Sequence, residues 1–198
     1  MTNAENESPR DRVLRVAGEL FYERGFHAVG IDLIIDRSRV AKATLYRHCA
    51  TKDDLIAAYL DDANQRFWSW LDSVTDPVLP PVDRLARLFD SVAMLATSPM
   101  CLGCTFQVAA AEFPDPSHPG HTVALGHKQA VREQLYELAV AADAKRPDDL
   151  ADGLLLLMDG AFAVARMYGP DNPGRSVAIA ARALIAANAP GRHPAARR

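Results

Sequence analysis

The sequence predicts an all-α fold of about nine helices. Apolar residues recur at spacings of three and four, the period of an amphipathic helix. Alternating apolar and polar runs bounded by hairpin turns are nearly absent, so strands are not expected. Several helical segments also begin at residues that commonly cap helix N-termini, and proline or glycine follows their ends.

The first helix is predicted to begin after Ser8, an N-cap residue, with Pro9 in its first position and Asp11 in its first turn. Gly25 is predicted to end this helix in the usual role of a C-terminal glycine. The apolar residues between these ends are spaced by three and four and form the expected buried face: Val13, Val16, Ala17, Leu20 and Phe21.

Two short helices joined by a turn are predicted next. The first begins at Ile31, and its buried stripe includes Ile34 and Ile35. The turn covers residues 38–41, and the second short helix runs from about Lys42 to His48. A unit this short cannot fold alone, so the first helix is expected to pack across it.

The second short helix carries five polar side chains within about two turns: Lys42, Thr44, Tyr46, Arg47 and His48. Such side chains suit phosphate oxygens and base edges, and a short helix fits the major groove of B-DNA. The alternative is a helical hairpin whose cations are only solvated. The pattern favours a DNA-binding surface.

The remaining helices are predicted from the same signals. Thr51 is a candidate N-cap with Asp54 three positions later, and the helix that follows runs to about Ser73. A proline-rich break covers residues 76–81. Further helices are expected over residues 82–97, 102–112, 121–144, 147–168 and 174–188.

Three parts of the chain are therefore expected. Residues 1–52 form a helix-turn-helix DNA-binding domain of three helices, and residues 53–189 form a helical effector-binding and dimerisation domain. Residues 190–198 are expected to be a disordered tail.

The charge distribution supports this division. The chain carries a net charge of −3, but residues 1–52 carry +2 and residues 53–198 carry −5. From residue 31 to 52 there are five basic and two acidic side chains. A basic end on an acidic body would orient the molecule on a polyanion.

The composition also indicates the cellular compartment of the protein. No apolar run approaches the roughly 20 residues that span a bilayer, and the polar N-terminus does not resemble a secretory signal. Three cysteines, an odd and sparse set, argue against a secreted disulfide framework. A soluble cytoplasmic protein is expected.

The segment from Phe21 to Leu55 resembles the TetR/AcrR family of bacterial transcription regulators. The residues that match the family pattern in register are Phe21, Gly25, Phe26, Ile34, Val40, Thr44, Leu45, Tyr46, His48, Thr51, Lys52 and Leu55. The chain departs from the pattern at three positions. Arg39 replaces the turn glycine, Ala41 the serine that caps the recognition helix, and Cys49 a phenylalanine.

The resemblance implies seven DNA-contacting residues. Those nearest the bases would be Lys42, Ala43, Thr44 and Arg47, and those that hold mostly phosphates would be Tyr46, His48 and Lys52. Arg39 is an additional candidate for a phosphate or base contact. Lys52 also has an independent rationale, since it lies at a helix N-terminus, where backbone N–H groups attract phosphate.

The resemblance further implies a homodimeric repressor that a small apolar effector releases from a near-palindromic operator. Candidate effector contacts are the apolar Trp68, Phe89, Phe106 and Phe162 and the polar Glu112 and His121. The last two helices, rich in small residues, would form the dimer interface. No membrane partner and no cofactor are expected.

Two other functions remain open. Cys101 and Cys104 could form a thiol switch that senses an oxidant. The loop with Glu112, His118 and His121 could belong to an enzyme, although no catalytic motif supports that reading. A metal site is disfavoured: no second cysteine pair exists, and His121 and His127 lie on different sides of a helix.

Overall fold

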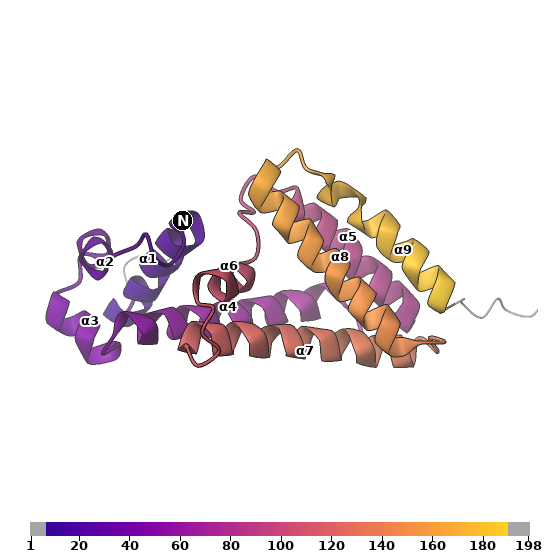
Figure 1. The fold of residues 1–198 in the computed structure, drawn as a ribbon, viewed down its shortest axis with the longest axis horizontal. Coiled ribbons are helices and arrows are strands. Elements are labelled where there is room, and N and C mark those ends of the chain that lie inside the picture. Colours follow the sequence, from indigo (N-terminus) through magenta and orange to yellow (C-terminus); the bar gives the residue numbers. More distant parts are fainter. Residues whose placement is uncertain (1–6, 190–198) are drawn as a thin grey trace, which may run out of the picture. The chain divides into compact units, whose positions relative to one another are not determined.

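The computed structural model describes residues 7–189, and within that range it is built from helices without strands, which confirms the all-α prediction (Figure 1). In chain order the helices are α1 (Pro9–Arg24), α2 (Ile31–Ser38), α3 (Lys42–His48), α4 (Lys52–Val74), α5 (Pro81–Ala96), α6 (Thr105–Glu112), α7 (Pro119–Ala141), α8 (Pro147–Tyr168), the 3-10 helix η1 (Pro173–Ser176) and α9 (Val177–Asn188). The predicted tail, 190–198, lies outside the described residues. No helix in the described range is long and apolar enough to cross a membrane.

Two compact units divide the chain. Unit 1 contains the described residues up to Arg66 together with Thr105–His127, and unit 2 contains Phe67–Cys104 and the residues from Lys128 onward. Helix α6 and the start of α7 therefore belong to the same unit as the helix-turn-helix, although they lie far from it in the sequence. The functional boundary after residue 52 stays a prediction.

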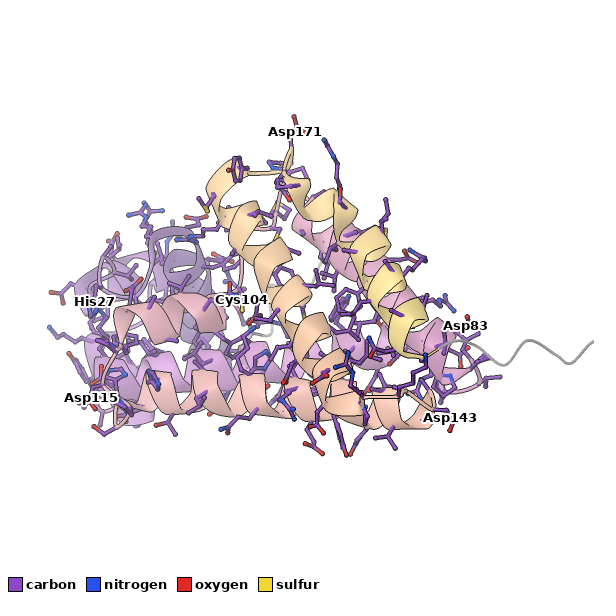
Figure 2. The ribbon with its side chains drawn as sticks, turned by 45° about the vertical axis from the view of Figure 1, so that its right-hand side comes forward. His27, Asp83, Cys104, Asp115, Asp143 and Asp171 are labelled. Atoms are coloured by element: carbon purple, nitrogen blue, oxygen red, sulfur yellow. The ribbon has the colours of Figure 1, made fainter. Side chains whose placement is uncertain are left out.

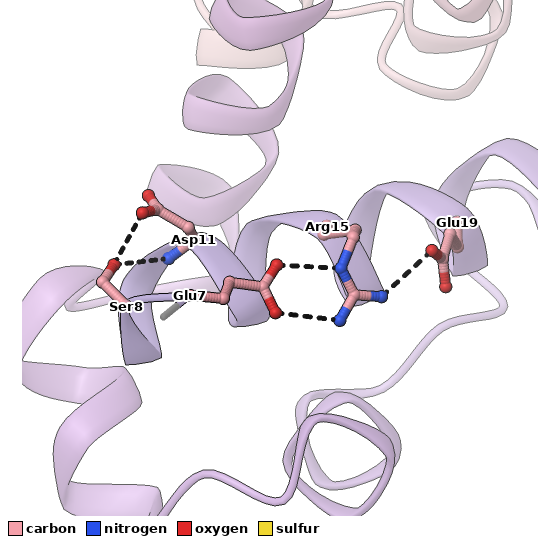
Figure 3. A network of polar contacts seen from close by, with 5 residues as sticks. All are labelled: Glu7, Ser8, Asp11, Arg15 and Glu19. Carbon is pink, nitrogen blue, oxygen red and sulfur yellow. Dashed lines mark hydrogen bonds and ion pairs between the residues drawn. The ribbon is translucent and has the colours of Figure 1, made fainter. Parts of the chain in front are cut away.

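Helix α1 has the ends that the sequence predicts. The backbone N–H of Asp11 donates to Oγ of Ser8 at 3.1 Å, and the Ser8 hydroxyl donates to the Asp11 carboxylate at 2.7 Å (Figure 3). At the other end Gly25 adopts φ +84°, and its N–H donates to the carbonyl of Phe21 at 2.9 Å. These bonds satisfy backbone groups that a helix end leaves unpaired.

The core of unit 1 contains a group of aromatic rings. Phe26 lies 5.1 Å from Phe21, 6.1 Å from Tyr59 and 5.6 Å from Phe113, measured between ring centroids. These rings come from α1, the loop after it, α4 and the segment after α6. Tilted pairs at such separations stabilise a core by about 1 kcal/mol each beyond their burial.

Unit 2 contains three helices that lie side by side. Helix α5 packs against α8 and α9, and α8 packs against α9 (Figure 1). Their buried side chains include Leu85, Phe89, Leu154 and Met158. Small residues allow close packing here, because a Cβ added to Gly153 would lie 2.7 Å from a Leu184 methyl group.

Some helix ends differ from the predicted ones. Helix α6 begins at Thr105 rather than near residue 102, because Gly103 adopts φ +96° and cannot lie in a helix. The last helical segment begins with the 3-10 helix η1, whose Gly174 N–H donates to the side chain of Asn172 at 2.7 Å. Helix α7 begins at Pro119 and ends at Ala141, so both of its ends lie slightly before the predicted ends at residues 121 and 144.

Candidate nucleic-acid interface

Helices α2 and α3 and the turn between them form a helix-turn-helix packed on α1. Helix α1 contacts both α2 and α3. The side chains that fix this packing are fully or almost fully buried: Ile34, Val40 and Leu45 have exposures of 0%, 5% and 1%. Burial of each stabilises the unit by about 2 kcal/mol. Val40 and Leu45 thus face the interior of this unit.

Leu45 anchors α3 and leaves the remaining faces of this helix open. Lys42, Ala43, Arg47 and His48 are exposed and Thr44 is half-buried. An α-helix has a diameter of about 10–12 Å with its side chains, which suits a groove about 12 Å wide. A surface of this shape can enter the major groove while its buried side holds it on α1.

The eight predicted DNA contacts all lie on α3, on the turn before it or at the start of α4. Tyr46 is 42% exposed, Arg39 is exposed, and Lys52 is half-buried at the first position of α4. All eight belong to one short segment of the chain, residues 39–52, and each is at least partly exposed. Their roles toward DNA stay predictions.

Lys42 has a partner that the sequence analysis missed. Its Nζ lies 3.2 Å from Oδ1 of Asp32 on α2, and both side chains are exposed. Exposed pairs of this kind contribute less than about 1 kcal/mol. Lys42 can therefore exchange Asp32 for a phosphate or base at small cost. Lys42 and Asp32 lie on two helices separated by a turn, and helical periodicity does not relate such positions. The contact between them is therefore seen only in the structure.

The turn keeps its left-handed geometry without the glycine of the family pattern. Arg39 adopts φ +53° and ψ +34° directly after α2. A side chain in this region costs about 1–2 kcal/mol relative to glycine. The next departure, Ala41, is the N-cap of α3 and makes no side-chain capping bond. The turn is therefore strained at one position and uncapped at another.

The start of α4 is capped as predicted. The backbone N–H of Asp54 donates to Oγ1 of Thr51 at 3.0 Å, and the Thr51 N–H donates to the Asp54 carboxylate at 2.9 Å. This reciprocal pair fixes the first turn of α4. It also holds Lys52 immediately beside the end of α3.

Cys49, the third departure, is a buried thiol between α3 and α4. Burial raises the pKa of this thiol; nearby Asp54 raises it further, while Arg10 lowers it. A raised pKa keeps the side chain as a neutral thiol, so Cys49 acts here as a small apolar core residue.

The six candidate effector contacts are divided between the two units. Phe89 is fully buried in the core of unit 2, and Trp68 and Phe162 pack against that core. Phe106, in unit 1, stacks on the ring of His127 with centroids 3.6 Å apart. Phe89 is thus a structural core residue; the effector roles of all six stay predictions.

Glu112 and His121, the polar candidates, have partners within unit 1. The Glu112 carboxylate accepts a hydrogen bond from the backbone N–H of His27 at 2.7 Å. His121 donates from Nδ1 to the carbonyl of Phe113 at 2.8 Å. Figure 2 labels His27 in this part of the chain. The first bond holds the end of α6 to the loop between α1 and α2, and the second holds the start of α7 to the residue that follows α6.

The side chains considered as metal ligands have other partners. His118 stacks on Phe113 at 3.9 Å, and its Nδ1 accepts from the N–H of Gly120 at 3.0 Å. Asp115, labelled in Figure 2, accepts from the N–H and hydroxyl of Ser117, and these bonds lower its pKa. Between residues 7 and 189 no metal-binding group of three or more such side chains is present.

The two cysteines of the proposed thiol switch lie just before α6. Cys101 and Cys104 are both free and half-buried, and Cys104 is labelled in Figure 2. Gly103 between them packs tightly on α8, since an added Cβ would lie 3.0 Å from Cβ of Arg166. This packing explains the glycine and leaves the oxidant-sensing hypothesis untested.

Comparison with known proteins identifies relatives of this arrangement. A sequence profile of bacterial regulatory proteins of the tetR family matches residues 13–59. The crystal structure of SCO4454, a TetR-family transcriptional regulator from Streptomyces coelicolor, superposes with a TM-score of 0.86 and 32% identity, covering 91% of this chain and 96% of that chain.

Two curated relatives match over shorter stretches. The HTH-type transcriptional activator FasR of Mycolicibacterium smegmatis is 44% identical over 59 residues, which are 28% of this chain and 27% of that protein. The HTH-type transcriptional repressor KstR2 of the same species is 28% identical over 92 residues, 44% of this chain and 43% of that protein. The chain thus matches less than half the length of these two relatives.

All of these relatives are transcriptional regulators, and none is an enzyme. The prediction of a regulator rather than an enzyme is confirmed at this level. Three findings agree on the family. The chain contains a helix-turn-helix whose α3 is open to solvent, a family profile matches this segment, and a solved relative is similar over nearly its whole length. The chain belongs to the TetR family of bacterial regulatory proteins.

Proposed function

We propose that the chain is a homodimeric repressor that binds a near-palindromic operator and releases it when a small apolar effector binds. The observation that carries the proposal is the arrangement of α3. Leu45 is 1% exposed and fixes this helix on α1, while the polar side chains around it face outward. A rigid helix with such a face is suited to the major groove.

Within the proposed complex, base contacts come from the first turns of α3. Lys42, Ala43, Thr44 and Arg47 supply the donors, acceptor and methyl groups that distinguish base pairs. Tyr46, His48 and Lys52 hold phosphates and set the register of the helix in the groove. Arg39 adds a cation at the turn.

Dimerisation is proposed through α8 and α9. Both helices present large apolar side chains to solvent: Leu156 on α8 is 73% exposed and Ile179 on α9 is 72% exposed. Apolar side chains exposed on adjacent, packed helices favour a protein interface. A two-fold dimer would place two recognition helices in successive major grooves, so half-sites about one helical turn apart are expected.

The effector is proposed to be apolar because the aromatic candidates in unit 2 lie in or against an apolar core. Trp68 and Phe162 pack on that core without being fully buried in it, so they can border a ligand. Effector and DNA must weaken each other's binding by the same factor, because the two equilibria are linked. The relatives include an activator as well as a repressor, so the sign of regulation needs its own measurement.

One experiment tests the proposal. Duplexes that the protein retains from a random-sequence pool are sequenced, and the mass of the complex on the enriched duplex is measured by analytical ultracentrifugation. The proposal expects an enriched inverted repeat and two protomers per duplex. Retention of unrelated sequences, or one protomer on a single half-site, would contradict it. A promoter fusion carrying the repeat then distinguishes repression from activation.

A further inference from the structure

A polar groove of about 540 Å³ lies on unit 1, between α1 and the C-terminal end of α2. Its lining includes five arginines and two glutamates, a net charge of +3 when all are ionised. The arginines are Arg12, Arg15, Arg24, Arg37 and Arg39. This groove is separate from the candidate effector contacts, and it includes the C-terminal end of α2 and the turn that follows it.

One of the five arginines is already paired. The Arg15 guanidinium donates to both oxygens of Glu7, at 2.9 and 3.1 Å, and to Glu19 at 3.2 Å (Figure 3). The bond from Arg15 also lowers the pKa of Glu7. Two carboxylates are thereby committed to one guanidinium, and they leave the other arginines of the groove uncompensated.

The other four arginines have no such partner. Among residues 7–189, no carboxylate lies within 4 Å of the guanidinium of Arg12, Arg24, Arg37 or Arg39. Moreover, Nε of Arg12 is buried, and no residue in the described part of the chain offers it a hydrogen-bond acceptor. A solvated surface arginine keeps its donors in water, whereas a buried donor without an acceptor is costly and rare in folded proteins.

We propose that this groove binds a phosphate-type anion. A guanidinium group matches the geometry of a phosphate and can donate two parallel hydrogen bonds to two of its oxygens. Several arginines around one groove can therefore bind the same anion. A rotation of the Arg12 side chain toward the groove would bring its buried Nε–H to the anion and give it an acceptor. Glu19 and Glu23 also line the groove, and their carboxylates would repel the anion from their own part of it.

The expected occupant is a backbone phosphate of the operator, and this part of the inference rests on the proposed function. Arg39 belongs both to the groove and to the turn of the helix-turn-helix. The groove therefore continues the candidate DNA interface from α3 onto α1. Phosphate contacts of this kind position a protein on the duplex without reading bases. A free phosphate compound presents the same chemistry and is the other source to be distinguished.

The test observes the groove directly. Nitrogen-15 spectra of the arginine Nε–H groups are recorded while the protein is titrated with its enriched operator duplex and, separately, with inorganic pyrophosphate. Arg12→Gln identifies the Arg12 resonance. In parallel, operator affinity is measured against salt concentration for the wild type, for Arg37→Gln, and for Arg175→Gln as a control. Arg37 is exposed, so its replacement should leave folding intact, and Arg175 is an exposed arginine of unit 2.

We expect the Arg12 resonance to shift saturably with the operator. Arg37→Gln should weaken operator binding about tenfold and reduce the slope of log affinity against log salt by about 0.9, with Arg175→Gln unchanged. A saturable shift with pyrophosphate alone, with normal operator binding by Arg37→Gln, would assign the groove to a free anion. No shift with either titrant and an unchanged slope would overturn the proposal. Failure of the wild type to bind any duplex would refute the proposed function, while the pyrophosphate titration would still decide the groove.

Discussion

Glu112 and His27, 85 positions apart, are joined by two hydrogen bonds. The backbone N–H of His27 donates to Oε2 of Glu112 at 2.7 Å, and the His27 ring donates from Nε2 to the Glu112 carbonyl at 2.9 Å. Glu112 is the last residue of α6, and His27 lies in the loop between α1 and α2. The end of α6 is thereby tied to the segment that leads into the helix-turn-helix.

Gly25 should be sensitive to substitution for two reasons. Its φ of +84° disfavours any side chain, and an added Cβ would lie 2.3 Å from Oε1 of Glu112. We expect Gly25→Ala to lower the free energy of unfolding by roughly 2–3 kcal/mol, measured by urea denaturation. In a Glu112→Ala background only the backbone strain remains, so the same substitution should cost less. Equal costs in both backgrounds would show that the carboxylate does not crowd Gly25.

Replacement of Arg39 should separate backbone strain from charge. Arg39→Gly removes the Cβ from a left-handed residue with φ +53° and should raise the free energy of unfolding by about 1 kcal/mol. Arg39→Ala keeps the Cβ and removes the guanidinium, so its stability should stay near that of the wild type. Both variants should lose the same fraction of operator affinity if Arg39 contacts DNA. If Arg39→Gly is no more stable than Arg39→Ala, the strain argument is wrong.

Ala41→Ser should restore the missing cap of α3. The serine oxygen can accept a hydrogen bond from the N–H of Ala43, the second residue of α3. A side-chain cap of this kind adds about 1 kcal/mol to the free energy of unfolding. Ala43→Ser, inside the same helix, is the matched control and should slightly destabilise it. Thermal denaturation of the two variants measures the difference, and equal shifts would exclude a capping effect.

The three cysteines should differ in reactivity. Burial raises the pKa of Cys49, so at pH 8 less thiolate forms there than at an ordinary cysteine. Cys101 and Cys104 are half-buried and should react first with iodoacetamide. Mass spectrometry of the labelled peptides should find Cys49 modified mainly after denaturation. Modification of Cys49 at the rate of Cys101 in the native protein would contradict the assignment of a protected thiol.

Local signals in the sequence predicted the parts of the fold that local interactions determine. Ser8 and Thr51 cap helices because their side-chain oxygens accept hydrogen bonds from backbone N–H groups three positions later. Gly25 ends α1 because its backbone adopts a positive φ and its N–H donates to the carbonyl of Phe21.

Contacts between distant segments could not be obtained in this way. The bond of Glu112 to His27 and that of His127 to Asn64 join positions 85 and 63 apart. Each depends on how helices pack, which periodicity does not report. The candidate effector residues were inferred from residue type and family resemblance, and residue type alone did not separate Phe89, a fully buried core residue, from the partly buried Trp68.

The central claim is that the open face of α3 binds operator DNA, and Tyr46 tests it most directly. Tyr46 is 42% exposed, so Tyr46→Ala should leave the fold intact. Fluorescence anisotropy on the enriched operator is measured for the wild type, for Tyr46→Ala and for Val78→Ala, which changes a side chain that is 89% exposed between α4 and α5. We expect Tyr46→Ala to abolish specific binding and Val78→Ala to bind as the wild type does. Full operator affinity in a folded Tyr46→Ala variant would contradict the assignment of α3 as the recognition helix.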